Sequence, residues 1–483
     1  MNDNRSRHRP AFGKHRIYYN NFAAHLLNAY NPNMLYPDLP YRWTDADWKH
    51  ILEMVRGFGF NTFQFWLVPH LFCREGIDSE YGKAFIQQMT GVIDYAHALD
   101  LQVDMLCSLA TVGSQWHTLC PNMAEEWQEL RFLWDAWAHI LPVDRISIFP
   151  GDPGACSRNG CTAVTFIDKA LEIAQMVKGI KSDVKIVLHT WGPPFFGWGN
   201  VQGPPGWRGE FVQSYQHTAW TFDRARMERS MAHLLERLPD FPQPATVAIN
   251  LGFNPDGIPE GESNAVPWAK EIAKTHAIET WDFSLTEGEN AILPHYRFQR
   301  LFSQRQRERV SAPYSGGICF TMTPLLNQLS LYESAQSFIN PDASPENLAV
   351  EFYEMLYGSE GRAVVPFLPL FEVIPDWGNY HSIKMPRSRY HQAMVELTAL
   401  LHGLQAQGNE DFAFHPSPEY HRQELFFYAD LFSKLSGQSP AYEDLEKRYW
   451  NKVYHIYDYL PAHVDPRPHR AVDNLIKRFA EWK

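Results

Sequence analysis

The sequence lacks the features of a membrane protein and of a nucleic-acid binder. It has no run of about 18 apolar residues, the length that a transmembrane helix needs. Its 43 lysines and arginines are outnumbered by 55 aspartates and glutamates, so the formal net charge is −12. That acidic balance argues against general binding to nucleic acids or to anionic membranes. We therefore expect neither nucleic acid nor a membrane among its partners.

Cysteine is also scarce, and no cofactor motif is present. Six cysteines in 483 residues do not form the dense framework of a disulfide-stabilised domain. Cys156 and Cys161 are close, but no second pair of cysteines or histidines stands at zinc-finger spacing. No Gly-x-Gly-x-x-Gly turn follows the first predicted strand, which weighs against a dinucleotide-binding fold. The sequence thus predicts no metal and no cofactor.

The N-terminus carries no recognisable targeting segment. Its first 16 residues are basic and lack the apolar stretch of a secretory signal peptide. We therefore expect a cytoplasmic protein.

Aromatic residues, by contrast, are abundant, with 31 Phe, 22 Tyr and 16 Trp. Their flat apolar faces stack on sugar rings, which favours a carbohydrate partner. A large aromatic-rich core explains the same composition equally well. Hydrophobic residues make up 45% of the chain, enough for such a core and too many for global disorder.

Short apolar segments alternate with amphipathic stretches along the first two thirds of the chain. One unit begins at Thr44, which precedes Asp45 and Asp47 as a typical helix N-cap, and apolar residues at helical spacing follow. The predicted strands cover residues 16–22, 61–68, 102–108, 145–149, 185–190, 246–251, 278–284 and 317–323. The predicted helices between them cover residues 48–56, 84–98, 123–139, 165–178, 223–238, 266–274 and 296–307.

Eight strands joined by seven helices predict a parallel sheet with right-handed crossovers. Eight is also the number of units in a closed (β/α)8 TIM barrel, so we assign residues 1–340 to a catalytic barrel of this kind. A doubly wound open sheet is the alternative. Residues 341–483 lack convincing strands and show helical periodicity, which predicts a mostly helical C-terminal region. That region either caps the barrel or mediates association into a homo-oligomer.

Barrel enzymes carry their active sites on the loops that follow the strands. The loop after the fourth strand is a Gly/Pro turn centred on Asp152, a candidate catalytic residue. The alternative is an aspartate that only closes the turn through its own backbone amides. His189 and Trp191 end the fifth strand, where a histidine beside a tryptophan suits the binding of sugar hydroxyls. The alternative is a buried histidine bonded to a neighbouring strand.

The region of the seventh strand is rich in carboxylates. Asp282, Glu287 and Glu289 fall within eight residues at the strand tip. Strand alternation predicts that Thr280 and Asp282 face the barrel interior, whereas Trp281 faces the helices. Repulsion between the carboxylates raises the pKa of at least one, which suits a general acid. The alternative is a solvated acidic loop in which Glu287 caps the next helix.

Further polar and aromatic residues are predicted at the same end of the barrel, where the strands end. Gln64 and Trp66 alternate with apolar neighbours on the second strand, and Asn290 follows the carboxylates. Arg297 either binds an anionic group or pairs with those carboxylates. Asn327, after the eighth strand, either reaches the site or fixes its loop.

Two features carry a resemblance to a known group of enzymes. One is the acidic residue in the turn Gly151-Asp152-Pro153-Gly154, and the other is the barrel exit, where Asn327 precedes a turn at 340–346 (NPDASPE) and a helix ending at 357–358 (YG). In both features the chain resembles the group of (β/α)8 glycoside hydrolases that includes the α-glucuronidases and the β-N-acetylhexosaminidases. The resemblance covers roughly residues 15–360.

The resemblance implies a carbohydrate substrate and catalytic carboxylates after the strands. The α-glucuronidases place a glutamate as acid after strand four, so Asp152 and the strand-seven carboxylates would share such roles here. The hexosaminidases carry an adjacent acidic pair after strand four, whereas Pro153 follows Asp152 in this chain. Substrate-assisted hydrolysis of an N-acetyl sugar is therefore not supported.

These patterns predict an exo-acting glycoside hydrolase that uses paired carboxylates. Asp152 forms one wall, Glu287 or Glu289 the other, and Asp282 supports them. The predicted substrate-binding residues are Gln64, Trp66, His189, Trp191, Asn290, Arg297 and Asn327. One alternative is a metal-dependent barrel isomerase, epimerase or lyase that uses Asp152, His189, Asp282 and Glu287 as ligands. Another is a non-catalytic carbohydrate-binding protein.

Overall fold

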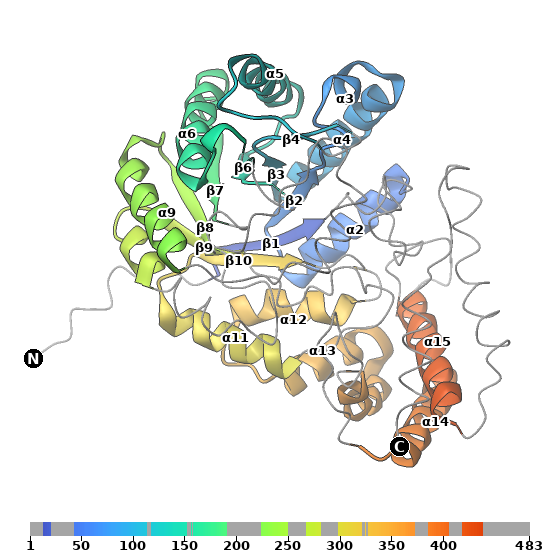
Figure 1. Ribbon diagram of the computed structural model, residues 1–483. Coiled ribbons are helices and arrows are strands. Elements are labelled where there is room, and N and C mark those ends of the chain that lie inside the picture. Colours follow the sequence, from blue (N-terminus) through green and yellow to red (C-terminus); the bar gives the residue numbers. More distant parts are fainter. Residues whose placement is uncertain are drawn as a thin grey trace, which may run out of the picture. The chain divides into compact units, whose positions relative to one another are not determined.

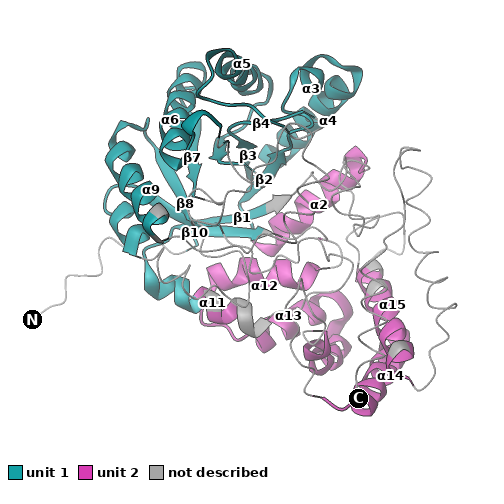
Figure 2. Ribbon diagram, in the orientation of Figure 1, with its two compact units in different colours: residues 1–20, 60–283, 306–319 teal, residues 21–59, 284–305, 320–483 magenta. Residues whose placement is uncertain are grey.

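The computed structural model describes residues 13–20, 43–113, 117–151, 156, 158–190, 224–249, 267–281, 298–320, 324, 327–371, 385–404 and 418–437. The chain divides into two compact units (Figure 2). Unit 1 comprises Met1–Asn20, Phe60–Phe283 and Gln306–Cys319, and unit 2 comprises Asn21–Gly59, Ser284–Arg305 and Phe320–Lys483. The predicted domain boundary after residue 340 stays a prediction.

Unit 1 contains a closed barrel of eight strands (Figure 1). The strands are β1 (His15–Asn20), β2 (Thr62–Leu67), β3 (Gln102–Ser108), β6 (Arg145–Phe149), β7 (Lys185–His189), β8 (Ala245–Ile249), β9 (Ala277–Thr280) and β10 (Gly316–Phe320). Their order around the barrel is β1-β10-β9-β8-β7-β6-β3-β2, and the paired strands run parallel. The predicted (β/α)8 barrel with a mostly helical region after it is confirmed, and each predicted strand begins within one residue of the observed one.

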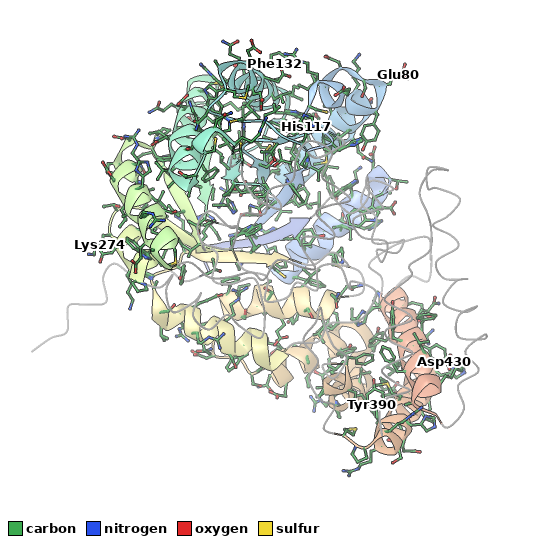
Figure 3. The ribbon with its side chains drawn as sticks, viewed as in Figure 1. Glu80, His117, Phe132, Lys274, Tyr390 and Asp430 are labelled. Atoms are coloured by element: carbon green, nitrogen blue, oxygen red, sulfur yellow. The ribbon has the colours of Figure 1, made fainter. Side chains whose placement is uncertain are left out.

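Helices connect the strands of unit 1. They are α3 (Arg74–Asp78), α4 (Glu80–Ala98), α5 (Ala124–Ile140), α6 (Ala163–Ile180) and α9 (Arg224–Arg237), with short 3-10 turns η3 (Arg158–Gly160) and η4 (Leu238–Asp240). Helix α5 packs against α6, and α6 packs against α9. A short antiparallel pair, β4 (Thr111–Val112) and β5 (His117–Thr118), precedes α5. Phe132 lies on α5 (Figure 3), and the guanidinium of Arg74 covers its ring at 4.1 Å.

Unit 2 is helical in its described parts. It contains α2 (Asp45–Phe58), α12 (Gln328–Ile339), α13 (Pro345–Tyr357), η6 (Gly358–Leu370), α14 (Arg387–Gly403) and α15 (Pro418–Ser436), while α11 (Phe298–Ser311) contributes to both units. Helix α14 packs against α15 and buries Tyr390 (Figure 3), which raises the pKa of its hydroxyl. No helix in the described ranges of the chain is long and apolar enough to cross a membrane.

Helix α2 shows how local sequence sets an element. Thr44 accepts a hydrogen bond from the backbone N–H of Asp47, and the Asp47 carboxylate accepts from the backbone N–H of Thr44 at 2.7 Å, which makes a capping box. The helix ends at Gly59, whose φ of +105° is the left-handed conformation that glycine adopts without strain. The predicted N-cap at Thr44 is confirmed, and the helix extends beyond the predicted residues 48–56 at both ends.

Candidate active site

Charged side chains fill the barrel interior where the strands begin. Arg145, the first residue of β6, donates from Nη1 and Nη2 to the Glu279 carboxylate of β9 at 3.0 and 2.6 Å. Because β7 and β8 separate β6 from β9 around the barrel, this pair crosses the interior. Arg145 Nε also lies 3.2 Å from Asp104 Oδ2, and all three side chains are buried. The layer is therefore an internally paired network of buried charges.

The pKa values in this layer follow from burial and pairing. Burial alone would raise the pKa of Glu279, but the charge and hydrogen bonds of Arg145 hold it below its usual value. Burial outweighs the same partner at Asp104 and raises its pKa, and Asp104 Oδ1 has no hydrogen-bond partner among the described residues. Burial lowers the pKa of His15 to about 4, although its Nε2 lies 4.0 Å from Glu279. These charges serve one another, which is typical of a structural network.

Gln64 connects this network with the layer above it. Its Nε2 donates to Asp104 Oδ2 at 3.0 Å, and Ser147 Oγ donates to the same oxygen at 3.0 Å. Its Oε1 accepts a hydrogen bond of 3.3 Å from Trp281 Nε1. Because both ends of the amide are engaged, Gln64 fixes the orientation of the Trp281 ring.

A histidine and aromatic side chains occupy the interior where the strands end. His189, the last residue of β7, meets Trp281 edge to face with ring centroids 5.2 Å apart. It is 1% exposed, and neither ring nitrogen has a hydrogen-bond partner in the part of the chain that the structure describes. Burial, assisted by the charge of Arg145, lowers the pKa of His189 to about 3, so the imidazole is neutral at pH 7. A neutral imidazole has one donor and one acceptor nitrogen.

Trp66 belongs to the same end of the barrel. It follows Gln64 on the same face of β2 and meets Phe149, the last residue of β6, edge to face at 5.6 Å. Along β6 the same face changes from Arg145 to Phe149, and along β2 it changes from Gln64 to Trp66. The interior thus changes from charged to aromatic toward the carboxyl ends of the strands, where barrel enzymes carry their sites.

The structure brings part of the predicted site together. Gln64 and His189 both contact Trp281, and Trp66 lies at the same end of β2. Asn327 lies in unit 2, buried directly before α12. The other predicted residues lie outside the described residues: Asp152, Trp191, Asp282, Glu287, Glu289, Asn290 and Arg297.

One predicted orientation is wrong. Strand alternation assigned Trp281 to the helices and Thr280 to the interior, whereas Trp281 contacts Gln64 and His189 inside the barrel. The tryptophan is tolerated inside because its N–H finds an acceptor there. The side chain of Thr280 instead lies against Gly317 of β10. A Cβ atom built on Gly317 would lie only 2.0 Å from Thr280 Oγ1.

Reasoning from the sequence also missed the charged network. Asp104, Arg145 and Glu279 each lie in a predicted strand whose adjacent residues are mostly apolar. A charged residue inside an apolar strand was the available signal, because such a residue is buried only when it is paired. The sequence does not indicate which partner each charge takes, since the pairs are distant along the chain.

The fold and the interior define a TIM barrel whose strand ends carry aromatic rings and a buried imidazole. No family model matches the chain, and no curated protein matches it. Among solved structures, the chain is similar to an O-GlcNAc hydrolase variant of Thermobaculum terrenum, with a TM-score of 0.50 and 13% identity over 91% of each chain. The proteins named CpGH84D and CpGH84B give TM-scores of 0.49 and 0.47 at 10% and 13% identity, covering 91% and 98% of this chain and 72% and 77% of theirs. The chain therefore has the barrel fold of that O-GlcNAc hydrolase.

Proposed function

We propose that this protein is an exo-acting glycoside hydrolase. The observation that carries the proposal is His189, a buried neutral imidazole with two unengaged nitrogens among the described residues, at the carboxyl end of a barrel strand beside Trp281. Sugar recognition needs an apolar ring for the C–H face and short polar groups for the hydroxyls. The barrel fold agrees with this function, since barrels of this kind include glycoside hydrolases.

The proposed chemistry needs two carboxyl groups on opposite sides of the anomeric carbon. We assign these roles to Asp152, after β6, and to Glu287 or Glu289, after β9, with Asp282 in support. One protonates the leaving oxygen, and the other attacks the anomeric carbon or activates water. A carboxylate separation of about 5 Å would give retention, and one of about 6.5–9.5 Å would give inversion.

The substrate-binding part of the proposal assigns His189 to a sugar hydroxyl and Trp66 and Trp281 to the sugar ring. Gln64 acts through Trp281, whose N–H it binds. Trp191, Asn290, Arg297 and Asn327 complete the proposed binding set. Arg297 makes an acidic sugar a reasonable substrate, because a guanidinium pairs with a carboxylate.

A panel of aryl α- and β-glycosides tests the function. It should include uronides, and also an N-acetyl-β-glucosaminide because the Thermobaculum terrenum protein is named an O-GlcNAc hydrolase. The wild-type protein is compared with Asp152→Asn and Glu287→Gln, each with and without EDTA. We expect aglycone release from one glycoside, insensitive to EDTA and lost in both variants. A protein that cleaves none of the panel, or whose activity follows added metal, is not a two-carboxylate glycosidase.

A further inference from the structure

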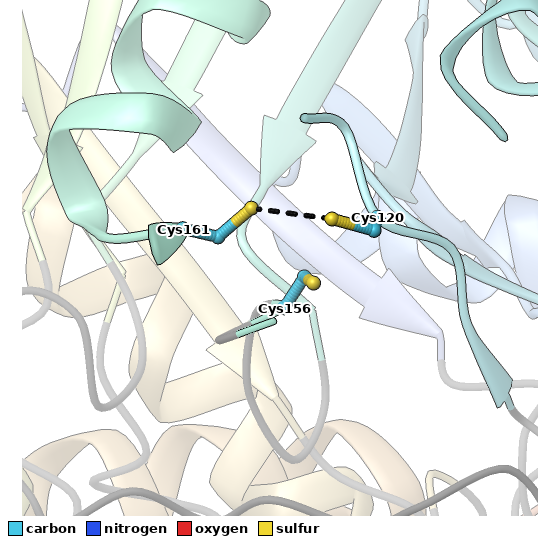
Figure 4. A group of neighbouring side chains, drawn as sticks. All are labelled: Cys120, Cys156 and Cys161. Carbon is cyan, nitrogen blue, oxygen red and sulfur yellow. Dashed lines mark hydrogen bonds between the residues drawn. The ribbon is translucent and has the colours of Figure 1, made fainter. Parts of the chain in front are cut away.

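Three buried cysteines from separate segments meet in unit 1 (Figure 4). Cys120 lies between β5 and α5, and Cys156 and Cys161 lie between β6 and α6. Their Sγ atoms all lie within 4.8 Å of one another, and those of Cys120 and Cys161 are 3.6 Å apart. The exposed fractions are 0, 7 and 7%. We call this group the cysteine triad.

The spacing of the sulfurs fits a tetrahedral metal ion. A Zn–S bond of about 2.3 Å in tetrahedral geometry places neighbouring sulfurs about 3.8 Å apart. The Sγ–Sγ distance between Cys120 and Cys161 is close to that value, and a disulfide would require a separation of about 2.05 Å. Cys156 and Cys161 also have the C-x4-C spacing of zinc ligands, and the fold supplies Cys120 as the third.

The loop between Cys156 and Cys161 directs hydrogen-bond donors at the sulfurs. The backbone N–H of Arg158 donates to Cys156 Sγ at 3.3 Å, and Asn159 Nδ2 donates to Cys120 Sγ at 3.4 Å. Asn159 has a φ of +49°, a left-handed conformation that asparagine tolerates, and it brings its amide to the sulfur. Donors of this kind stabilise thiolates and are typical of the surroundings of metal ligands.

The charges of the triad also call for a cation. Burial opposes ionisation of Cys120, yet the donors from Asn159 and the backbone lower its pKa. Burial and the neighbouring sulfurs raise the pKa values of Cys156 and Cys161. Three thiolates this close together require a positive ion between them.

We propose that the triad binds one Zn²⁺ through the Sγ atoms of Cys120, Cys156 and Cys161. Each thiol releases one proton as its sulfur coordinates the ion, which leaves the fourth tetrahedral position to a ligand from outside the triad. The ion joins the segment before α5 to the segment before α6.

The first experiment counts metal on the full-length, untagged chain, purified reduced and without chelator. Elemental analysis should give about one Zn²⁺ per chain. Replacing the zinc with Co²⁺ should produce the near-ultraviolet thiolate-to-cobalt charge-transfer band in the wild-type protein, and this readout needs no variant and no activity. Less than about 0.1 Zn²⁺ per chain after incubation with excess zinc would overturn the proposal.

Serine variants then assign the ligands. Cys120→Ser, Cys156→Ser and Cys161→Ser should each lose zinc and the cobalt band. Cys73→Ser is the matched control, because Cys73 is also 7% exposed and its sulfur caps α3, a role that serine fulfils well. It should bind as much zinc as the wild-type protein. Equal zinc in all four variants, or a Cys120–Cys161 disulfide found by non-reducing peptide mapping, contradicts the site.

Discussion

The two ends of the barrel interior handle buried polar groups in opposite ways. Where the strands begin, Arg145 pairs with both Asp104 and Glu279. Where the strands end, His189 lies equally deep but has no hydrogen-bond partner among the described residues. Burial without a partner costs about 1–3 kcal/mol for a neutral polar group. The difference teaches that the charges at the first end satisfy one another, whereas His189 at the second end is not satisfied by any described residue, which is why we propose that it binds a ligand.

Removing the arginine should have the largest effect on the first end. Arg145→Met leaves two carboxyl groups buried without their cation, and we expect the free energy of unfolding to fall by about 3–5 kcal/mol. Urea unfolding measures this loss. The added changes Asp104→Asn and Glu279→Gln should recover part of it, because they remove the uncompensated charges.

The exposed Arg74–Glu129 pair provides the control for this measurement. Arg74→Met should unfold at nearly the wild-type urea concentration, because solvent screens exposed pairs. If Arg145→Met were as mild as Arg74→Met, the charged layer would not stabilise the barrel.

At the other end, His189→Phe should affect function and leave stability nearly unchanged. An apolar ring of similar shape removes two ring nitrogens that have no hydrogen-bond partner among the described residues, so the unfolding free energy should stay within about 1 kcal/mol of the wild type. Loss of one or two hydrogen bonds to substrate should lower kcat/KM for the responsive glycoside by about 10–100-fold.

His421→Phe is the matched control, because His421 of α15 in unit 2 is also fully buried with its pKa lowered to about 3. Its Nε2 lies 3.3 Å from the Tyr353 hydroxyl. Its replacement should therefore cost some stability and no activity. A His189→Phe variant with full activity would show that this histidine only packs the barrel.

A lower pH should reveal the depressed pKa of His189 as a loss of folding stability. The pKa of His189 is about 3 in the folded protein and about 6.5 ordinarily, so below pH 6.5 the unfolded chain binds a proton that the folded chain does not. Stability therefore falls as the pH drops from 6.5 toward 3, by up to about 2 kcal/mol at pH 5 from this group.

Urea midpoints at about pH 7.5 and about pH 5 measure this effect. The decrease of the urea midpoint between the two pH values should be smaller in His189→Phe than in the wild type. The control is His402→Gln, which replaces an exposed histidine and should show the same decrease as the wild type. An identical fall in His189→Phe would mean that His189 takes up its proton in the folded state.

The sequence predicted the frame of the barrel well, because strand and helix periodicities are local. Helix α2 is the clearest case, since Thr44, Asp47 and Gly59 determine its ends through contacts within a few residues. The facing of Trp281 was wrong because alternation alone does not tell which side of a strand is the interior. Gln64, distant along the chain, supplies the acceptor that makes the inward position favourable.

The site was predictable to a smaller degree for the same reason. His189 and Trp66 stood out because polar and aromatic residues at strand ends are typical of barrel sites. The pairing of Arg145 with Glu279 depends on the closure of the barrel, which brings β6 and β9 to opposite sides of one interior. The cysteine triad likewise depends on Cys120, which lies far from the other two in sequence.

The smallest expected effect concerns the contact between the two ends, the hydrogen bond from Trp281 to Gln64. Trp281→Phe keeps an aromatic ring beside His189 but leaves Gln64 Oε1 without its donor, so we expect a loss of about 1 kcal/mol. In a Gln64→Leu background the same change should cost less, with a coupling energy of about 0.5–1.5 kcal/mol in a double-mutant cycle. Urea unfolding of the four proteins gives this value. Strict additivity would mean that the two ends are energetically independent, and that Gln64 has no part in orienting Trp281 toward the site.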